Sequence, residues 1–175
     1  MIRVGILGLA RREGTFAEVG LRSWEEAGCA AVERALMTGN EGLYIVHRPL
    51  VIRSARAELE RILRDWCDAP DVPSPCDLIL TVGGTGYSGA DVMPEATQML
   101  LKRGAPGIIE VMRHAALVAG HSQDCVSRGV AGIRGRTLLI NLPGVVKGMA
   151  DEDSLTLATQ ALAPFLPDMM AAILG

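Results

Sequence analysis

The chain has 175 residues, of which 49% are hydrophobic, so it can form one domain with a substantial core but is too short for two large ones. Aromatic residues make up only 3%, and a core filled by aliphatic side chains favours an α/β fold over an aromatic-rich β-sandwich. A formal net charge of −3 gives no general field that would attract nucleic acid.

The four cysteines, Cys29, Cys67, Cys76 and Cys125, lie far apart, and no Cys-x-x-Cys pair or signal peptide is found. We therefore expect reduced thiols and a cytoplasmic protein. His121 and Cys125 could share a helix face as metal ligands, but without a third ligand we interpret them as an ordinary turn and a buried thiol. No apolar run approaches the ~20 residues of a membrane-spanning helix, which predicts a soluble protein.

The first part of the chain alternates predicted strands and helices. Ile2–Leu9 is a short apolar run, typical of a buried strand. Ser23 begins a capping box for a helix that ends at Gly39, and Leu43–Val46 forms the next strand. Ser54 can cap a second helix before the loop that starts at Asp68. The predicted apolar face of that helix consists of Leu59, Ile62, Leu63 and Trp66.

Leu78–Val82 is the clearest predicted strand, because every residue is apolar or β-branched and glycines follow at once. This alternation of strands and helices is typical of βαβ units and predicts a mostly parallel sheet. Pro94 opens a predicted helix that continues through Lys102 and is closed by Gly104, since proline is tolerated at the first helical position.

A further helix is predicted over Ile108–Val118, directly after Pro106. Ile109, Met112 and Ala116 would lie on one apolar face. Glu110 and Arg113 are three residues apart, so we expect them to form an ion pair on the helix surface.

Two strands and a helical tail complete the predicted fold. Val130–Ile133 and Thr137–Leu142 are separated by a short Arg-Gly-Arg turn, a spacing that predicts a small antiparallel hairpin element. The tail Leu155–Leu174 contains Pro164 and Pro167, which predict two packed helical pieces.

The glycine loop Gly83-Gly84-Thr85-Gly86 follows the clearest strand and precedes a predicted helix. Backbone N–H groups in such a loop, together with a helix N-terminus, can receive an anion, and glycines let a ligand approach the backbone. A bare turn is the alternative interpretation. The sequence lacks G-x-G-x-x-G after the first strand and G-K-[ST] after any glycine loop, which argues against hydride transfer and P-loop chemistry.

Asp91 lies five residues beyond Gly86, in the same predicted loop. A carboxylate there could hold Mg²⁺ against phosphates that the glycines gather. A turn or near-cap aspartate explains the position equally well, so both interpretations stay open at this point.

The segment from Asp77 to Gly86, followed by Asp91–Thr97, closely resembles the signature of the MoaB/Mog family. That family includes molybdopterin adenylyltransferases and the matching domains of gephyrin and plant molybdenum-cofactor proteins. Three further segments resemble it in order: Pro106-Gly107 with Glu110 and Arg113, Ser127–Gly135, and Leu139–Gly144. Four ordered matches between Asp77 and Lys147 are far more specific than one glycine loop.

The resemblance implies a three-layer α/β/α fold in a single domain over residues 1–175, assembled as a homo-oligomer, commonly a trimer and in some cases a hexamer. It implies binding of molybdopterin and, in active members, adenylylation of its phosphate with Mg-ATP during molybdenum cofactor biosynthesis. By position, Gly83, Gly84, Thr85 and Gly86 would hold nucleotide phosphates, with Asp91 as catalytic residue and Mg²⁺ ligand. The pterin-phosphate side would be lined by Ser127, Arg128, Asn141, Pro143 and Gly144.

Four positions depart from the family pattern. Ser54 stands where the family usually carries an aspartate that looks like a Mg²⁺ ligand in active members, and Leu9–Arg12 lacks the aspartate of a Ser-Asp-Arg stretch. Val145-Val146 replaces a frequent Ser-Pro, and Met93 replaces a capping threonine, at a cost of ~1 kcal/mol. Since three of these changes remove polarity or charge at the predicted site, the alternatives to an active nucleotidyltransferase are a paralogue that binds without turnover and an oligomeric scaffold.

Overall fold

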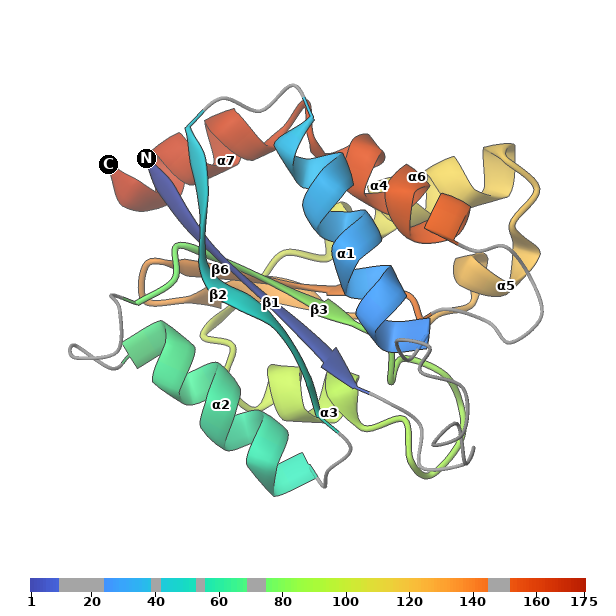
Figure 1. The fold of residues 1–175 in the computed structure, drawn as a ribbon, viewed down its shortest axis with the longest axis horizontal. Helices are drawn as coiled ribbons and strands as arrows, with labels where there is room; N and C mark the ends of the chain where they lie inside the picture. Colours follow the sequence, from blue (N-terminus) through green and yellow to red (C-terminus); the bar gives the residue numbers. More distant parts are fainter. Residues whose placement is uncertain (10–23, 39–41, 53–55, 69–74, 145–151) are drawn as a thin grey trace.

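The computed structural model describes residues 1–9, 24–38, 42–52, 56–68, 75–144 and 152–175. Within these ranges a mixed sheet lies between two layers of helices, which confirms the α/β fold class (Figure 1). The strands are β1 (Ile2–Leu9), β2 (Leu43–Ile52), β3 (Leu78–Val82), β4 (Arg103–Gly104), β5 (Ala131–Arg134) and β6 (Thr137–Leu142). The helices are α1 (Trp24–Met37), α2 (Arg56–Asp68), α3 (Met93–Gln98), α4 (Pro106–Val118), α5 (Ser122–Cys125), α6 (Glu152–Leu162) and α7 (Leu166–Leu174).

The six strands of the described sheet follow the order β2-β1-β3-β6-β5-β4. The pairs of β1 with β2, β1 with β3, and β3 with β6 are parallel, whereas β5 pairs antiparallel with both β6 and β4. The predicted parallel sheet with an antiparallel hairpin is therefore confirmed. Strand β1 lies in the interior of the sheet, which explains why six of its eight residues are buried.

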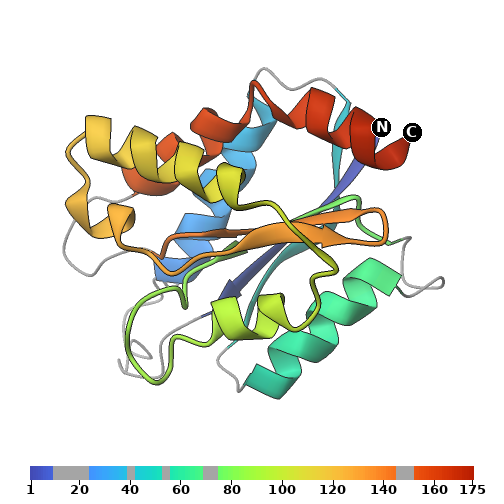
Figure 2. The ribbon, with the colours of Figure 1, turned by 180° about the vertical axis from the view of Figure 1, so that it is seen from behind.

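Each face of the sheet has its own apolar core. On one face, α1, α4, α6 and α7 cover residues such as Val4, Leu80 and Ile140. On the other face, α2 and α3 cover Leu7 and Ile79, with Trp66 of α2 among the buried side chains. The view from behind shows the same two helical layers with the sheet between them (Figure 2). Successive residues of β1 and β3 thus point into different cores, as the two-residue period of a strand requires.

The helix predicted from Pro94 to Lys102 is wrong in its extent. α3 ends at Gln98, because Lys102 donates its backbone N–H to Ile133 (2.9 Å) and the next two residues pair with β5 as strand β4. Gly104 therefore belongs to a strand and does not close a helix. β2 is longer than predicted and runs through Pro49 to Ile52, which an edge strand tolerates because proline lacks only the ladder donor.

The predicted ion pair between Glu110 and Arg113 does not form between these two described residues; Arg113 donates instead to the carbonyl of Ser127. The short helix α5 was not predicted. The two helical pieces of the tail are confirmed as α6 and α7. Several predictions lie outside the described residues: the caps Ser23 and Ser54, the stop at Gly39, Arg11-Arg12 and Val145-Val146.

In the described part of the chain, no single helix has the length and apolar character needed to cross a membrane. The bent pair Ser154–Leu162 and Leu166–Leu174, with an angle of 56°, passes that test together by length and composition alone.

Candidate functional site

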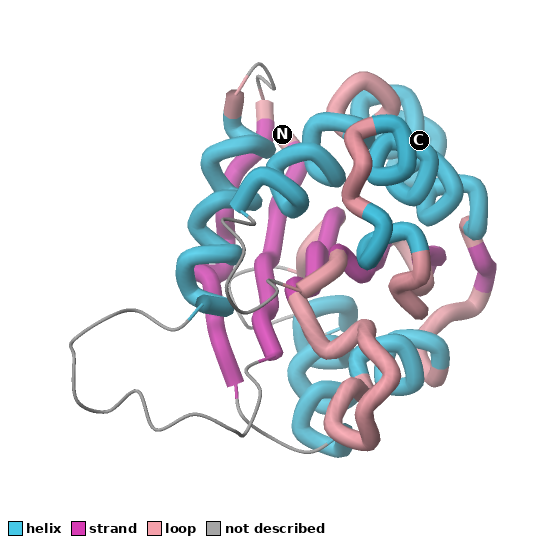
Figure 3. Tube along the Cα trace, turned by 90° about the vertical axis from the view of Figure 1, so that its right-hand side faces the viewer, coloured by secondary structure: helices cyan, strands magenta, loops and turns pink. Residues whose placement is uncertain are grey.

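The parallel strands β1, β3 and β6 end at the same edge of the sheet, and the described segments after β3 and β6 meet there, where Gly83 N–H donates to the Pro143 carbonyl (Figure 1). In the described sheet, β2 lies on one side of β1 and β3 lies on the other, so a topological switch point lies between β1 and β3. In open α/β sheets, ligands bind outside the carboxyl ends of the strands at such a point. Figure 3 views the molecule toward this edge, where loops lie between the helical layers.

The glycine loop after β3 has a backbone that only glycine adopts easily. Gly83 and Gly84 have φ angles of 83° and 68°. A Cβ on Gly84 would lie 2.5 Å from Cδ2 of Leu9, at the end of β1. Gly83 donates its N–H to the carbonyl of Pro143 (3.3 Å), and the carbonyl of Gly84 accepts from Met93 N–H (3.1 Å). Positive φ and close packing together explain the pair of glycines.

Met93 is the first residue of α3, the helix whose predicted capping threonine is missing. Val92 precedes α3 without a side-chain cap, but the Gly84 carbonyl takes up the first N–H of the helix, and the Met93 side chain is fully buried. The start of α3 is thus stabilised by this backbone hydrogen bond and by apolar packing of Met93, and not by a capping side chain. Because α3 has only six residues, the predicted contribution of its N-terminus to anion binding is small.

Asp91 is 3% exposed, and its Oδ2 accepts a hydrogen bond from the backbone N–H of Ser88 (2.9 Å). The carboxylate therefore helps to close the loop between Gly86 and α3. This contact supports the turn interpretation. The role of Asp91 as catalytic residue and Mg²⁺ ligand stays a prediction.

Arg128 holds the glycine loop from the opposite side. Its Nε donates to the carbonyl of Gly86 (2.6 Å), its Nη2 to the carbonyl of Asp91 (2.6 Å), and its Nη1 to Glu95 of α3. The backbone N–H of Arg128 also donates to the carbonyl of Thr85 (2.9 Å). The Arg128 guanidinium thus fixes the geometry of the loop through hydrogen bonds to backbone carbonyls. The hydrogen bond with Arg128 in turn keeps the pKa of Glu95 below its usual value.

Asn141 is 1% exposed, and its side chain connects β6 to three neighbouring segments. Its Nδ2 donates to the hydroxyls of Thr81 (2.8 Å) and Thr97 (2.9 Å), and its Oδ1 accepts from Val130 N–H (3.1 Å). Both amide protons are used inside the protein, so only the oxygen retains hydrogen-bonding capacity toward a ligand. Asn141 thus fixes β3, α3 and the segment before β5 around the site.

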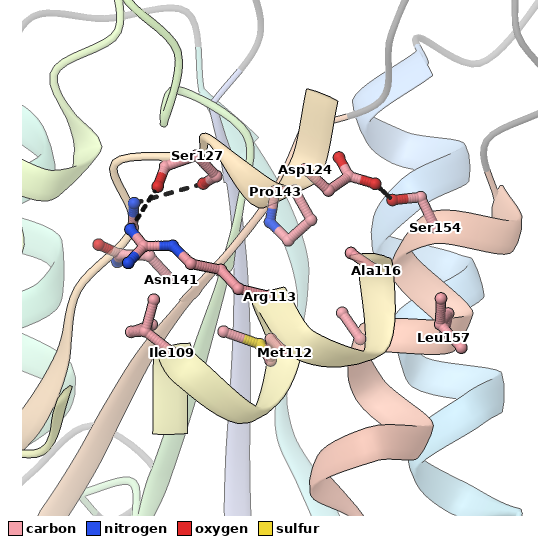
Figure 4. A pocket seen from close by; sticks show the side chains of 12 residues that line it. Ile109, Met112, Arg113, Ala116, Asp124, Ser127, Asn141, Pro143, Ser154 and Leu157 are labelled. Carbon is pink, nitrogen blue, oxygen red and sulfur yellow. Dashed lines mark hydrogen bonds between the residues drawn. The ribbon is translucent and has the colours of Figure 1, made fainter. Parts of the chain in front are cut away.

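A small pocket lies beside the glycine loop, beyond the carboxyl end of β6 (Figure 4). Ser127, Asn141 and Pro143 line it, which brings three of the residues predicted for the pterin side together. Its volume is about 20 Å³, enough for about one water molecule in this conformation. Arg128 and Gly144 are not among the described residues that line it, although Gly144 packs on Gly83, where an added Cβ would lie 3.1 Å from the Gly83 Cα.

Arg113 of α4 is the functional candidate that the sequence analysis missed. Its Nη2 donates to the Ser127 carbonyl (2.6 Å), while its Nε is buried and has no hydrogen-bond partner among the described residues. Figure 4 shows the side chain between Ser127 and Met112 in the pocket. A buried guanidinium nitrogen without a partner costs free energy unless a ligand or water satisfies it. Its place within the resemblance was visible in the sequence, but its direction was not.

Asp124 and Ser154 close the far side of the pocket with a hydrogen bond between α5 and α6 (Figure 4). The nearby Cys125 is half-buried, and its thiol donates to the carbonyl of His121 (3.5 Å). Two other thiols are poor ligands or nucleophiles, because burial raises the pKa of both Cys67 and Cys76 to about 12. In the described ranges no three His, Cys, Asp or Glu side chains converge in a manner that could hold a metal ion.

Comparison with known proteins shows which proteins this chain is similar to. A family model described as a probable molybdopterin-binding domain matches residues 35–162. A molybdopterin adenylyltransferase of Helicobacter pylori is 34% identical over 125 residues, which cover 71% of this chain and 65% of that protein. The chain thus spans somewhat less than two thirds of that relative. A molybdopterin adenylyltransferase of Escherichia coli is 32% identical over 152 residues, 86% of this chain and 71% of that protein.

Solved structures extend the similarity over the whole fold. The molybdopterin biosynthesis enzyme MoaB of Thermus thermophilus has a TM-score of 0.76 at 34% identity, covering 99% of this chain and 96% of that chain. A molybdopterin biosynthesis protein of Mycobacterium abscessus has a TM-score of 0.75 at 27% identity, covering 98% of this chain and 96% of that chain. The overall fold is therefore similar to that of these proteins.

Proposed function

Because the chain belongs to the family of probable molybdopterin-binding domains, the MoaB/Mog family, we propose that it binds molybdopterin and adenylylates it with Mg-ATP in molybdenum cofactor biosynthesis. The observation that carries this proposal is the juxtaposition of two different sites at one sheet edge. A glycine loop built from backbone adjoins a pocket that contains the Nε of Arg113, for which the described residues provide no hydrogen-bond partner. Two phosphate-bearing substrates would meet there.

The two sites divide the substrates between them. The loop Gly83–Gly86 would receive the phosphates of ATP, since its glycines let them approach the backbone. Ser127 and Arg113 would receive the phosphate of molybdopterin, and Pro143 would line the same side. Arg128, Asn141 and Gly144 would act next to the pterin by holding the loops in place, as their contacts within the protein indicate.

The reaction needs little covalent help from the protein. An oxygen of the molybdopterin phosphate attacks the α-phosphorus of ATP, the new P–O bond forms, and the bond from the α-phosphorus to its bridging oxygen breaks. Pyrophosphate leaves with that bridging oxygen and its electron pair. Catalysis then consists of positioning the two phosphates and neutralising their charge, which backbone N–H groups and a guanidinium supply.

Magnesium would be held by Asp91 together with phosphate oxygens. Mg²⁺ is commonly bound through one or two carboxylates and substrate phosphates, with several waters retained, so a single carboxylate at the loop fits such an ion. When bound, the ion would neutralise charge on the phosphates. The described residues offer no cage of three or more ligands, and the affinity for Mg²⁺ without nucleotide should accordingly be low.

Binding without turnover is the second candidate. It is favoured by the hydrogen bond that already engages the Asp91 carboxylate with Ser88 and by the serine at position 54, which lies outside the described residues. Under this alternative the pocket still takes molybdopterin, and the chain serves as a carrier or scaffold. The predicted trimer and the cytoplasmic location apply to both candidates and stay predictions.

Adenylyl transfer can be measured directly. Purified protein is mixed with molybdopterin, ATP and MgCl₂, and pyrophosphate release is followed together with the mass of the pterin product. The proposal expects one pyrophosphate for each adenylylated pterin, and no release when molybdopterin is left out. Binding of molybdopterin without any pyrophosphate would instead support the carrier alternative.

A further inference from the structure

Tyr87 follows the glycine loop directly and is 74% exposed, yet its ring is held in place by two contacts. Its hydroxyl donates to the carbonyl of Val126 (2.7 Å), across the gap between the two loops of the site. The guanidinium carbon of Arg128 lies 5.9 Å from the ring centroid, within the range of a cation–π contact. An exposed aromatic ring by itself is common, but one whose orientation is fixed from both sides needs an explanation.

The position of this ring relates it to both phosphate sites. Tyr87 is the residue after Gly86, whose carbonyl accepts from Arg128 Nε (2.6 Å), and Val126 precedes the pocket residue Ser127. Val126 is itself 57% exposed, so two exposed apolar side chains lie in the segments next to the glycine loop and the pocket. A substrate with its phosphate in the glycine loop would carry its other end past Tyr87, the next residue of that loop.

A fixed and exposed aromatic ring is suited to stacking. Aromatic rings pair face to face with offset or edge to face, and a tyrosine contributes a large contact area at small cost in conformational entropy. The contact with Arg128 does not bury the ring, because 74% of the residue remains exposed. An open part of the ring is therefore available to a ligand that is flat and aromatic.

We propose that Tyr87 stacks on a planar, nitrogen-containing ring of a substrate and thereby selects ring-bearing phosphates at this sheet edge. Two substrates of the proposed function carry such a ring, in the adenine base of ATP and in the pyrimidine part of the pterin of molybdopterin, so this inference rests on that function. Stacking explains why the hydroxyl is bonded to Val126, because a preoriented ring loses little freedom when the ligand binds. The ring acts in recognition and takes no part in the transfer step.

The test uses the full chain and four ligands: ATP with Mg²⁺, inorganic triphosphate with Mg²⁺, molybdopterin, and a pterin without phosphate. Binding to the wild type is compared with binding to Tyr87→Ala and to Tyr87→Phe. Tyr87→Phe keeps the ring and removes only the hydrogen bond to Val126, which makes it the matched control. Circular dichroism of both variants checks that they fold.

The expected result is a loss of about tenfold in the affinity of one ring-bearing ligand for Tyr87→Ala, the order found for one stacked base. Tyr87→Phe should retain most of that affinity, and triphosphate should bind all three proteins equally. Weaker ATP with unchanged molybdopterin assigns the ring to adenine, and the reverse assigns it to the pterin. Triphosphate that weakens as much as ATP would show a general disturbance of the loop and overturn the inference.

Equal affinity of Tyr87→Ala and wild type for both ring-bearing ligands would also overturn it, as would a wild type that binds neither ring. The proposed function fails in a different way. If stacking is observed but no pyrophosphate is released with molybdopterin and ATP, adenylyl transfer is refuted while the role of Tyr87 stands. If transfer proceeds equally well in all three proteins with unchanged affinities, the proposed function stands and the inference about Tyr87 is refuted.

Discussion

The glycine loop and the neighbouring pocket lie at the ends of adjacent parallel strands, but they are built from different parts of the chain. The loop after β3 consists of backbone in a fixed conformation, with Gly83 and Gly84 at positive φ and carbonyls bonded to Met93 and Arg128. The pocket after β6 is lined by side chains from α4, α5 and α6 together with Ser127, Asn141 and Pro143. It contains the Nε of Arg113, which has no hydrogen-bond partner within the described part of the chain.

This difference bears on how each region responds to change. The shape of the loop depends mainly on its backbone, so a residue that this backbone cannot accept disrupts it most. A pocket built from side chains can lose one contact and keep the rest. We therefore expect one substitution in the loop to remove binding entirely, and substitutions in the pocket to weaken it in steps.

The largest effect is expected for Gly84→Val, which tests the loop. The new Cβ would meet Leu9 Cδ2 at 2.5 Å and Met93 Cβ at 3.2 Å, and a β-branched residue is strongly disfavoured at φ 68°. Binding of Mg-ATP should fall below detection in calorimetry, with a loss of about 1–3 kcal/mol in the free energy of unfolding from strain.

The matched control for this substitution is Gly89→Ala. Gly89 lies in the exposed part of the same loop between β3 and α3, and a Cβ there meets nothing within 4 Å, so both folding and nucleotide affinity should stay close to those of the wild type. A folded Gly84→Val protein that still binds Mg-ATP would refute the assignment of the loop to phosphate.

The second largest effect is expected for Arg113→Met, which tests the pocket. The substitution removes a charged donor to the molybdopterin phosphate, and hydrogen bonds to charged groups contribute ~1.5–3 kcal/mol, or about 10- to 100-fold in affinity. ATP affinity should change little, because Arg113 lies outside the glycine loop. Fluorescence titration with each ligand measures both. Equal losses for ATP and molybdopterin would show that the two regions are not separate sites.

The comparison also shows what the sequence could predict. Strand β3, the glycines after it and Asp91 lie within 14 consecutive residues, Leu78–Asp91, so residue type and local order were enough to place them. The strands β1, β5 and β6 were confirmed as well, because buried strands and a tight hairpin leave strong local patterns. Helix α2, which covers one face of the sheet, could be predicted from its apolar face.

The remaining features depend on contacts between distant segments. The three-residue spacing of Glu110 and Arg113 predicts a surface ion pair. In the structure α4 packs near the loop at Ser127, and the Arg113 side chain lies in the pocket instead. Likewise α3 ends at Gln98 because β4 is taken up by the edge of β5, a pairing that no helix-stop rule contains. Sequence periodicity carries no information on these tertiary contacts.

A smaller effect is expected for Asp91→Asn, which bears on whether the loop binds metal or only closes a turn. The amide oxygen can still accept from Ser88 N–H, so the melting temperature should change by no more than a few degrees. The loss of negative charge should weaken Mg-ATP by about tenfold in calorimetry, with inorganic triphosphate in the absence of Mg²⁺ unaffected. A large fall in melting temperature with unchanged Mg-ATP affinity would favour the turn interpretation.

The smallest effect is expected for Ser54→Asp, which asks whether the loop side can be strengthened as well as weakened. Position 54 lies outside the described residues, and the resemblance implies that active family members carry an aspartate there. With Asp91 as the single carboxylate, Mg²⁺ would retain most of its waters and neutralise the phosphates poorly. A second carboxylate should raise kcat by at most about tenfold.

Molybdopterin affinity should not change in Ser54→Asp, since its contacts lie in the pocket with Ser127. The sequence predicts Ser54 as a helix N-cap, and aspartate caps a helix as well as serine does, so folding should not confound the rates. Steady-state pyrophosphate release over a Mg²⁺ titration measures the effect. An unchanged kcat and Mg²⁺ dependence would mean that position 54 does not face the metal, and the loop side would then depend on Asp91 alone.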